Sequence, residues 1–287
     1  MKKLFVPAMA ALALALTGCA SKPAQIDPTP LPLNSTDSVA MQTLKSGFDN
    51  VPFDIDDVVV SSEAYQSKIG YGTSAGLGFL AHGGIGALGG LGMAAIINAG
   101  GDPSSDWLHY IAWVPADNID INDRAAIDEY LKTNYMKPAA DAFIASDFNK
   151  NMDHPTEFVS YQNGTYKVKG GACWPIMHGK EKYGECTLFY GNVVGLVRYA
   201  TPESGLPFEP EVKAKRYIVV RYSDANLNTA VMLPYLKSNM VSVYVPAMGY
   251  KAEHLNRFAP QDKPIVSKDA PFVLNNGVMN FFIKVKK

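Results

Sequence analysis

The chain has 287 residues, a formal net charge of −1 and 47% hydrophobic residues. This hydrophobic content supports a packed core and excludes an intrinsically disordered chain, and the length is enough for one large domain or two small ones. The sequence contains no basic block and no interleaving of aromatic with basic residues, so we expect no nucleic-acid partner.

The amino-terminal residues have the pattern of an export signal. Lys2 and Lys3 form a basic head, and an Ala/Leu-rich stretch from Leu4 to Leu16 follows them. A basic head, a short apolar stretch and small residues before a cleavage point are typical of a secretory signal. The apolar stretch is too short for an ordinary membrane-spanning helix.

The end of this signal, Leu16-Thr17-Gly18-Cys19, resembles the lipobox of bacterial lipoproteins. The resemblance implies that residues 1–18 are removed as a signal peptide and that Cys19 carries acyl chains such as palmitate. Ala20 and Ser21 follow rather than an acidic residue, a pattern similar to Gram-negative lipoproteins of the outer membrane. The alternative is an ordinary secretory signal with an incidental cysteine. We therefore expect a lipid-anchored protein, on the periplasmic face or the cell surface.

Residues 19–38 are predicted to form a lipidated tether. Four prolines in this segment are interleaved with Ser and Thr, namely Pro23, Pro28, Pro30 and Pro32. Such a composition favours extended polyproline geometry, at about 3.1 Å per residue. We expect one folded domain over residues 39–287, with a glycine-rich insertion at residues 69–101.

The first elements of this domain are predicted close to its start. Residues 39–48 are compatible with a short helix. A strand is expected within residues 53–62, where Val58, Val59 and Val60 are consecutive β-branched residues.

The insertion at residues 69–101 has an unusual composition. Its 33 residues include twelve Gly and six Ala but no Asp, Glu, Lys or Arg. Small residues recur mostly at intervals of four, and His82 interrupts the stripe. The stripe consists of Ser74, Gly78, Gly86, Gly90 and Ala94. Such a small-residue stripe lets helices approach each other closely in lipid, like a glycine zipper.

A helical hairpin fits this insertion better than one long helix. A single helix over thirty residues would be about 45 Å long, whereas a bilayer core is about 30 Å thick. Two shorter helices over residues 69–81 and 85–99, turning at residues 82–84, would each span about 20 Å. The hairpin would insert in a membrane or mediate oligomerisation. The alternatives are a hairpin buried in the fold and a glycine-rich loop.

The next segment is predicted to contain a strand and two helices. Residues 107–114 are mostly apolar and include Trp107, Tyr110, Ile111, Trp113 and Val114, a composition that favours a strand. The acidic turn at residues 117–123 offers helix caps, with a helix over 124–135 and a second beginning at Pro138 and ending near residue 148. A calcium loop is the alternative for the turn, but it lacks the glycine and closing glutamate of such loops.

The remaining chain is predicted to be rich in strands. Two hairpins are centred on Asn163-Gly164 and Asn276-Gly277, because Asn-Gly favours tight β-turns. Further strands are expected over residues 186–200, 213–223 and 240–246, and a helix interrupted by Pro234 over 226–239. This order of elements predicts an α+β fold, with an antiparallel sheet, a few helices and the inserted hairpin.

Cys173 and Cys186 are predicted to form a disulfide. An exported chain meets an oxidising compartment, and Cys19 is assigned to lipid. The twelve residues between them include Met177 and His178, so a copper site with Cys, Met and His ligands is one alternative. Two free thiols are the other.

Gly72-Thr73-Ser74-Ala75-Gly76 matches the G-x-S-x-G nucleophile elbow of hydrolases and resembles the corresponding motif of patatin-like phospholipases. A buried strand should lead into such an elbow, and the residues before Gly72 do not predict one. The His-Gly-Gly element at residues 82–84 follows the serine instead of preceding it, and the sequence has no Asp-Gly dipeptide. A serine esterase using Ser74 therefore stays a remote alternative, and we expect no enzyme.

The histidines do not predict a metal site. None of the five is paired with another at ligand spacing such as H-x-x-x-H. His109 lies in an apolar stretch, where a structural role is expected. The sequence contains no phosphate loop and no dinucleotide-binding motif, so we expect no cofactor.

These features predict an outer-membrane lipoprotein with a structural or interaction role. The lipobox and the Gly/Ala-rich segment are similar to those of the surface-exclusion and complement-resistance lipoproteins of conjugative plasmids. That resemblance implies homo-oligomers, and it covers only these two features. The expected partners are membrane lipid through Cys19, a second copy of the chain and an envelope protein. The alternative is a periplasmic-facing binding or assembly module with the hairpin buried in the fold.

Overall fold

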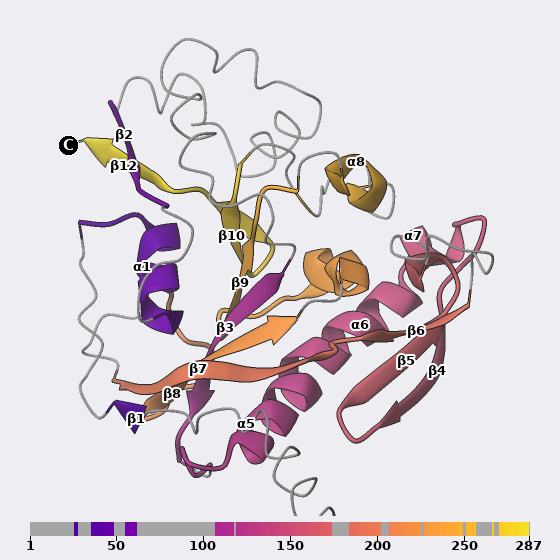
Figure 1. The fold of residues 1–287 in the computed structure, drawn as a ribbon, viewed down its shortest axis with the longest axis horizontal. Coiled ribbons are helices and arrows are strands. Elements are labelled where there is room, and N and C mark those ends of the chain that lie inside the picture. The colour runs from indigo at the N-terminus through magenta and orange to yellow at the C-terminus, as the bar shows by residue number, and fades with distance from the viewer. Residues whose placement is uncertain are drawn as a thin grey trace, which may run out of the picture.

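The structure is a computed structural model, and it describes eleven stretches of the chain. These are residues 26–27, 36–48, 55–61, 107–117, 119–173, 184–201, 207–224, 227–248, 251–256, 266 and 270–286. The signal peptide, Cys19 and the whole glycine-rich insertion lie outside the described residues. Within them, sheets and a few helices form an α+β fold, as the sequence predicts (Figure 1).

The larger sheet contains seven strands in the described part of the chain, in the order β1-β7-β8-β3-β9-β10-β11. We call it the large sheet. Its strands are β1 (Ile26–Asp27), β3 (Leu108–Pro115), β7 (Gly191–Ala200), β8 (Tyr217–Asp224), β9 (Val241–Val245), β10 (Phe272–Asn275) and β11 (Val278–Asn280). All its neighbouring strands are antiparallel except β1, which runs parallel to β7. β3 lies in the middle, and residues 108–114 are buried, because both faces of the sheet are covered.

Helices cover the two faces of the large sheet. Helix α1 (Val39–Gly47) lies against β3, where a Cβ atom added to Gly47 would be 2.7 Å from Ile111. Successive residues of a strand point to opposite faces, so Tyr110 lies on the other face of β3. There it packs against the Tyr222 ring of β8, over which Lys132 of the long helical segment is placed.

This long helical segment runs from residue 124 to residue 150. It consists of α5 (Arg124–Leu131), a π turn (Lys132–Met136), α6 (Lys137–Ala145) and α7 (Asp147–Lys150). Asp123 caps α5 by accepting a hydrogen bond from the Ala126 amide, as the acidic turn predicts. The expected break before Pro138 is wrong, because the π turn continues the helix into α6 and Pro138 is the second residue of α6, where its missing amide hydrogen is tolerated.

A smaller antiparallel sheet stands beside this helical segment (Figure 1). We call it the small sheet, and its strands are β4 (Glu157–Gln162), β5 (Thr165–Lys169) and β6 (Glu185–Leu188), in that order. The predicted Asn-Gly hairpin joins β4 to β5, with φ of 49° at Asn163 and 68° at Gly164. Positive φ at both positions is what a type I′ turn requires, so this hairpin is confirmed.

Two strand predictions are wrong in detail. Residues 186–200 form not one strand but two, β6 and β7, in different sheets, because the chain turns at Phe189 with a φ of 46°. The strand expected after Asn276-Gly277 also divides. β11 stays in the large sheet, while β12 (Ile283–Lys286) pairs in parallel with β2 (Val58–Ser61).

The helix expected at residues 226–239 is a 3-10 helix, η5 (Leu227–Tyr235). Pro234 lies inside it, and a proline removes one backbone donor from the helix interior. The described residues also contain the short helical elements η3 (Gly171–Cys173) and α8 (Lys251–Asn256).

Candidate functional site

The candidate functional site has two parts. One is the set of polar contacts that joins the two sheets, which we call the polar joint, and the other is the edges of the sheets. The polar joint is centred on Lys132, the first residue of the π turn, whose side chain is 9% exposed. Its ammonium donates a hydrogen bond of 2.7 Å to Asp128 and lies 3.4 Å from the carbonyl oxygen of Gly191, where β7 begins. Lys132 therefore connects the long helical segment to the large sheet.

Lys132 also contacts the small sheet. A Cβ atom added to Gly164, in the β4–β5 turn, would be 3.0 Å from the Lys132 side chain. The β4–β5 turn thus sits directly on this lysine. On the large sheet, the ammonium lies 5.5 Å from the centre of the Tyr222 ring of β8. Burial raises the pKa of Asp128 above its ordinary value, while the hydrogen bond from Lys132 opposes that rise.

The Tyr222 hydroxyl holds the link between β6 of the small sheet and β7 of the large sheet. We call this arrangement the Tyr222 clamp. The hydroxyl donates to the carbonyl oxygen of Phe189 and accepts from the amide of Gly191, both at 2.8 Å. The amide of Phe189 donates to the Thr229 hydroxyl at 3.0 Å. Tyr190 lies between the two fixed residues and is 74% exposed. The clamp therefore presents an exposed aromatic ring on a rigid support.

Two further groups are buried beside this clamp. The Tyr110 ring meets the Tyr222 ring edge to face at 5.7 Å, and Asp224 is fully buried at the end of β8. Burial and the nearby Asp224 carboxylate raise the pKa of both tyrosines well above the ordinary value. Both tyrosines are therefore neutral at physiological pH and act as packing groups, not as bases, and the Tyr222 hydroxyl also makes hydrogen bonds.

The first half of the β7 edge is covered by side chains from the long helical segment. Arg124 donates to the carbonyl oxygen of Gly195 at 3.2 Å, and Lys132 reaches that of Gly191. The spacing fits, since eight helical residues rise about 12 Å and four strand residues span about 13 Å. We call this the protected edge. Such cover keeps unpaired backbone groups from pairing with another chain.

The second half of the β7 edge is covered by β1. A bulge places three residues, 195–197, opposite Val220 alone, and the pairs Ile26–Val197 and Asp27–Arg198 lie at its end. β1 belongs to the segment predicted as a tether. The sequence did not indicate this pairing.

The small sheet ends in a different kind of edge. No strand lies outside β4 in the described residues, and we call this side of β4 the open edge. Two apolar side chains are exposed on it, Phe158 at 49% and Val159 at 37%. A bulge interrupts the β4–β5 pairing between Phe158 and Ser160.

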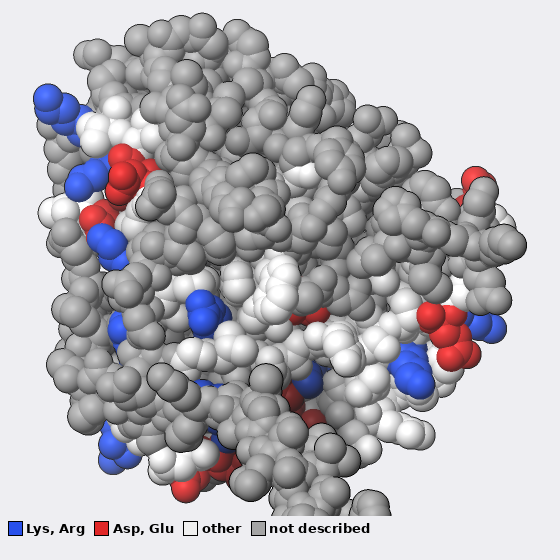
Figure 2. All heavy atoms as spheres, viewed as in Figure 1, with Lys and Arg blue, Asp and Glu red and all other residues white. Residues whose placement is uncertain are grey.

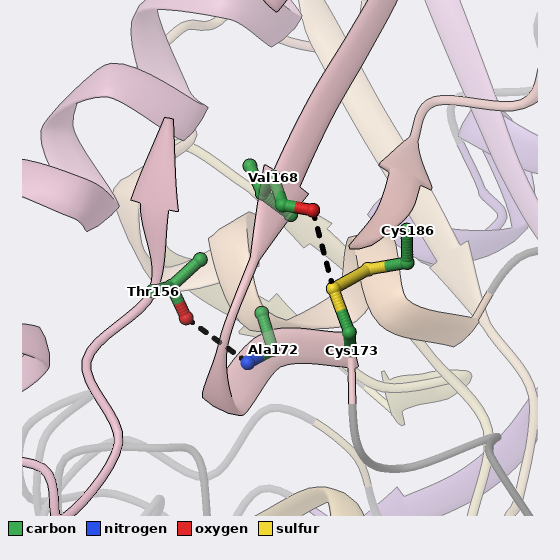
Figure 3. Close-up of a disulfide and its surroundings, with 5 residues drawn as sticks. All are labelled: Thr156, Val168, Ala172, Cys173 and Cys186. Carbon is green, nitrogen blue, oxygen red and sulfur yellow. Dashed lines mark hydrogen bonds between the residues drawn. A yellow bond between two sulfur atoms is a disulfide. The ribbon is translucent and has the colours of Figure 1, made fainter. Parts of the chain in front are cut away.

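The Cys173–Cys186 disulfide closes the other side of the small sheet (Figure 3). It joins η3 to β6, with Cα atoms 5.4 Å apart. Thr156 accepts a hydrogen bond of 3.0 Å from the Ala172 amide, and the Cys173 sulfur contacts the carbonyl oxygen of Val168. The predicted disulfide is confirmed. The copper and free-thiol alternatives are wrong, because both sulfurs are used in the bond.

His109 lies inside the large sheet, as expected for a structural residue. It packs edge-on to Phe48 at 5.3 Å and stacks with Tyr244 at 6.2 Å. Burial, together with the positive charge of Arg221, lowers the pKa of His109 from 6.5 to about 4.

The other predicted site residues cannot be placed, because they lie outside the described part of the chain. They are Cys19 and the stripe of Ser74, Gly78, Gly86, Gly90 and Ala94. Among the described residues, no three His, Cys, Asp or Glu side chains gather as metal ligands would. No helix in those same stretches has the length and apolar character to cross a bilayer.

The surface charges of the described residues are mixed. On the face shown in Figure 2, Lys and Arg are interspersed with Asp and Glu. Comparisons with protein-family models, curated proteins and solved structures find no match to this chain.

Proposed function

We propose that the chain is an outer-membrane lipoprotein with a structural or interaction role, anchored through acylated Cys19. The observation that carries the proposal is β1, because the chain pairs with the large sheet only seven residues after that cysteine. A segment that leaves a membrane anchor and joins the fold this early holds the body close to the bilayer. The Cys173–Cys186 disulfide supports export, since such bonds persist in oxidising compartments.

The glycine-rich insertion at residues 69–101 supplies the second part of the proposal. β2 precedes it and central strand β3 follows it. Its small-residue stripe, from Ser74 to Ala94, packs helix against helix in the membrane or between copies of the chain. The partners are therefore membrane lipid and a second copy of this protein.

The test removes the lipid and keeps the insertion. A Cys19→Ser variant is exported with a cleavable signal, and its membrane association and mass in detergent are compared with those of the acylated protein. The proposal predicts that the variant stays with washed membranes and runs as an oligomer. In a matched variant, Gly86→Leu and Gly90→Leu should abolish the oligomer, because the larger side chains keep the helices apart, while membrane association persists. A soluble monomer without detergent would overturn this role of the insertion.

The open edge favours a second candidate, a periplasmic-facing binding or assembly module. An edge strand can accept an extended peptide through main-chain hydrogen bonds, with specificity from alternate side chains. A photo-crosslinking residue at Phe158 should then capture a partner in cells. The same residue at Tyr190, which is exposed but away from the open edge, is the control. Equal capture at both positions would contradict this candidate.

A further inference from the structure

The short strand β1 carries one further inference. It consists of Ile26 and Asp27 alone, and it pairs in parallel with Val197 and Arg198 of β7 (Figure 1). Pro28 follows it immediately and has no amide hydrogen. The ladder therefore cannot continue regularly beyond Asp27, and β1 is held by a minimal number of backbone hydrogen bonds.

The next contacts along the chain do not depend on β1. The Ser38 amide donates to Asp57 at 2.7 Å, and Ser38 caps α1 by accepting from the Met41 amide at 3.0 Å. Lys284 donates to the Thr36 hydroxyl at 3.4 Å. Residues 36–38 are thus fixed to α1, to Asp57 and to β12. Loss of β1 would leave them in place.

These two attachments define two lengths of chain between the anchor and the body. Ile26 is seven residues from Cys19, and Thr36 is seventeen residues from it. At a maximum of about 3.5 Å per residue, the two segments reach at most about 25 Å and about 60 Å. Release of β1 therefore more than doubles the largest distance between Cys19 and the first residue that is attached to the body.

We propose that β1 is a releasable strap that sets two distances between the membrane and the folded body. The strap is closed when Ile26–Asp27 pairs with β7, and it is open when residues 36–38 are the first attachment. This inference rests on the proposed anchoring at Cys19. It assigns a regulatory role to a segment that the sequence predicts only as a spacer.

The experiment uses acylated full-length protein on lipid vesicles and compares two insertions. Six Gly/Ser residues are inserted after Ala24, on the anchor side of β1, or after Pro30, on the body side. A donor dye at exposed position 190 reports its distance from acceptor lipids by single-molecule energy transfer. The unmodified chain should give two populations. The anchor-side insertion should shift both to lower transfer, and the body-side insertion only the population with lower transfer.

A strap variant completes the test. Ile26→Pro with Asp27→Pro removes both amide hydrogens, so whichever of them points at β7 is lost. It should give one population with low transfer, shifted equally by both insertions. A single high-transfer population in the unmodified chain would overturn release of the strap. If both insertions, made in the chain with the unmodified strap, shifted every population equally, closure of the strap would be overturned.

A separate measurement distinguishes failure of the strap from failure of the anchor. In the full-length Cys19→Ser protein, without membranes, hydrogen exchange at whichever of the amides of residues 197 and 198 points at β1 should become about tenfold faster in the strap variant, because edge amides open locally. Unchanged exchange would contradict the strap whatever the anchor does. If the protein with Cys19 intact fails to bind vesicles while hydrogen exchange is still faster in the strap variant, the anchoring proposal fails and β1 is only an edge strand.

Discussion

The large and small sheets differ in how they manage their edges and what holds them. The large sheet has buried central strands, and its β7 edge is covered by Arg124, Lys132 and β1. The small sheet is held by a disulfide and by Lys132, and the outer side of β4 is open in the described residues. We infer that the two sheets have different roles. The large sheet supplies a stable body, and the small sheet supplies an accessible edge.

Gly191→Ala should have the largest effect, because it acts where the two sheets join. A Cβ atom there would overlap the carbonyl oxygen of Ser223, so the backbone of β7 or β8 must move. We expect a loss of about 3 kcal/mol in the free energy of unfolding, the upper end of the usual cost of overpacking. Chemical denaturation measures it, with Asn192→Ala, at an exposed neighbouring position, as the control. A loss as small as that of the control would mean that β7 and β8 are less tightly joined.

Replacing both disulfide cysteines by Ser should weaken the small sheet selectively. A loop of this length contributes about 3 kcal/mol in the chain-entropy model. Hydrogen exchange should accelerate in β4, β5 and β6 more than in β3 and β8. The same measurement on the reduced unsubstituted protein is the control. Uniform acceleration in both sheets would show that they unfold as one unit.

Acid should weaken the large sheet through His109. Its pKa is about 4 in the folded chain and 6.5 in the unfolded chain, so between these values the unfolded chain binds more protons. This contribution to stability is complete above pH 6.5 and is lost as the pH falls towards 4. At pH 5 the loss is about 2 kcal/mol. His109→Gln should flatten the dependence of the unfolding free energy on pH, and exposed His154→Gln should not. A slope unchanged in His109→Gln would contradict the assignment.

Lys132→Met should have the smallest effect of the four, about 1 kcal/mol, because it leaves Asp128 partly buried without its partner. Lys137→Met is the matched control. It breaks another ion pair four residues apart, whose side chains are 35% and 47% exposed. That change should cost only a few tenths of a kcal/mol. Equal losses would mean that Lys132 does not join the sheets.

Locally determined features could be predicted from the sequence. The Asn163-Gly164 turn, the Asp123 cap and β3 depend on residues next to each other in the chain. Even the disulfide needed only two cysteines and an exported chain. The division of residues 186–200 into two strands could not be predicted, because an apolar run does not show which sheet each half joins. The only local signal was Gly191, directly after the turn.

The polar joint was missed for a different reason. Asp128 and Lys132 are four residues apart on an amphipathic helix, a spacing typical of exposed ion pairs. Burial of this pair follows from the β4–β5 turn and Tyr222, which are distant in sequence. The same holds for β1, because nothing in a proline-rich segment identifies two residues that pair with a strand 170 positions away.

The π turn has a consequence for insertions and deletions in this chain. Five core residues on the long helical segment recur every four positions: Ile127, Leu131, Tyr135, Ala139 and Phe143. On a regular helix, four such steps would rotate the stripe by about 160°. The π turn accommodates one extra residue, equivalent to about 100° of rotation, and so keeps the stripe facing the core. A single deletion within Lys132–Met136 would turn one half of the helix away from the sheet, whereas a substitution there would leave the rotation of the two halves unchanged.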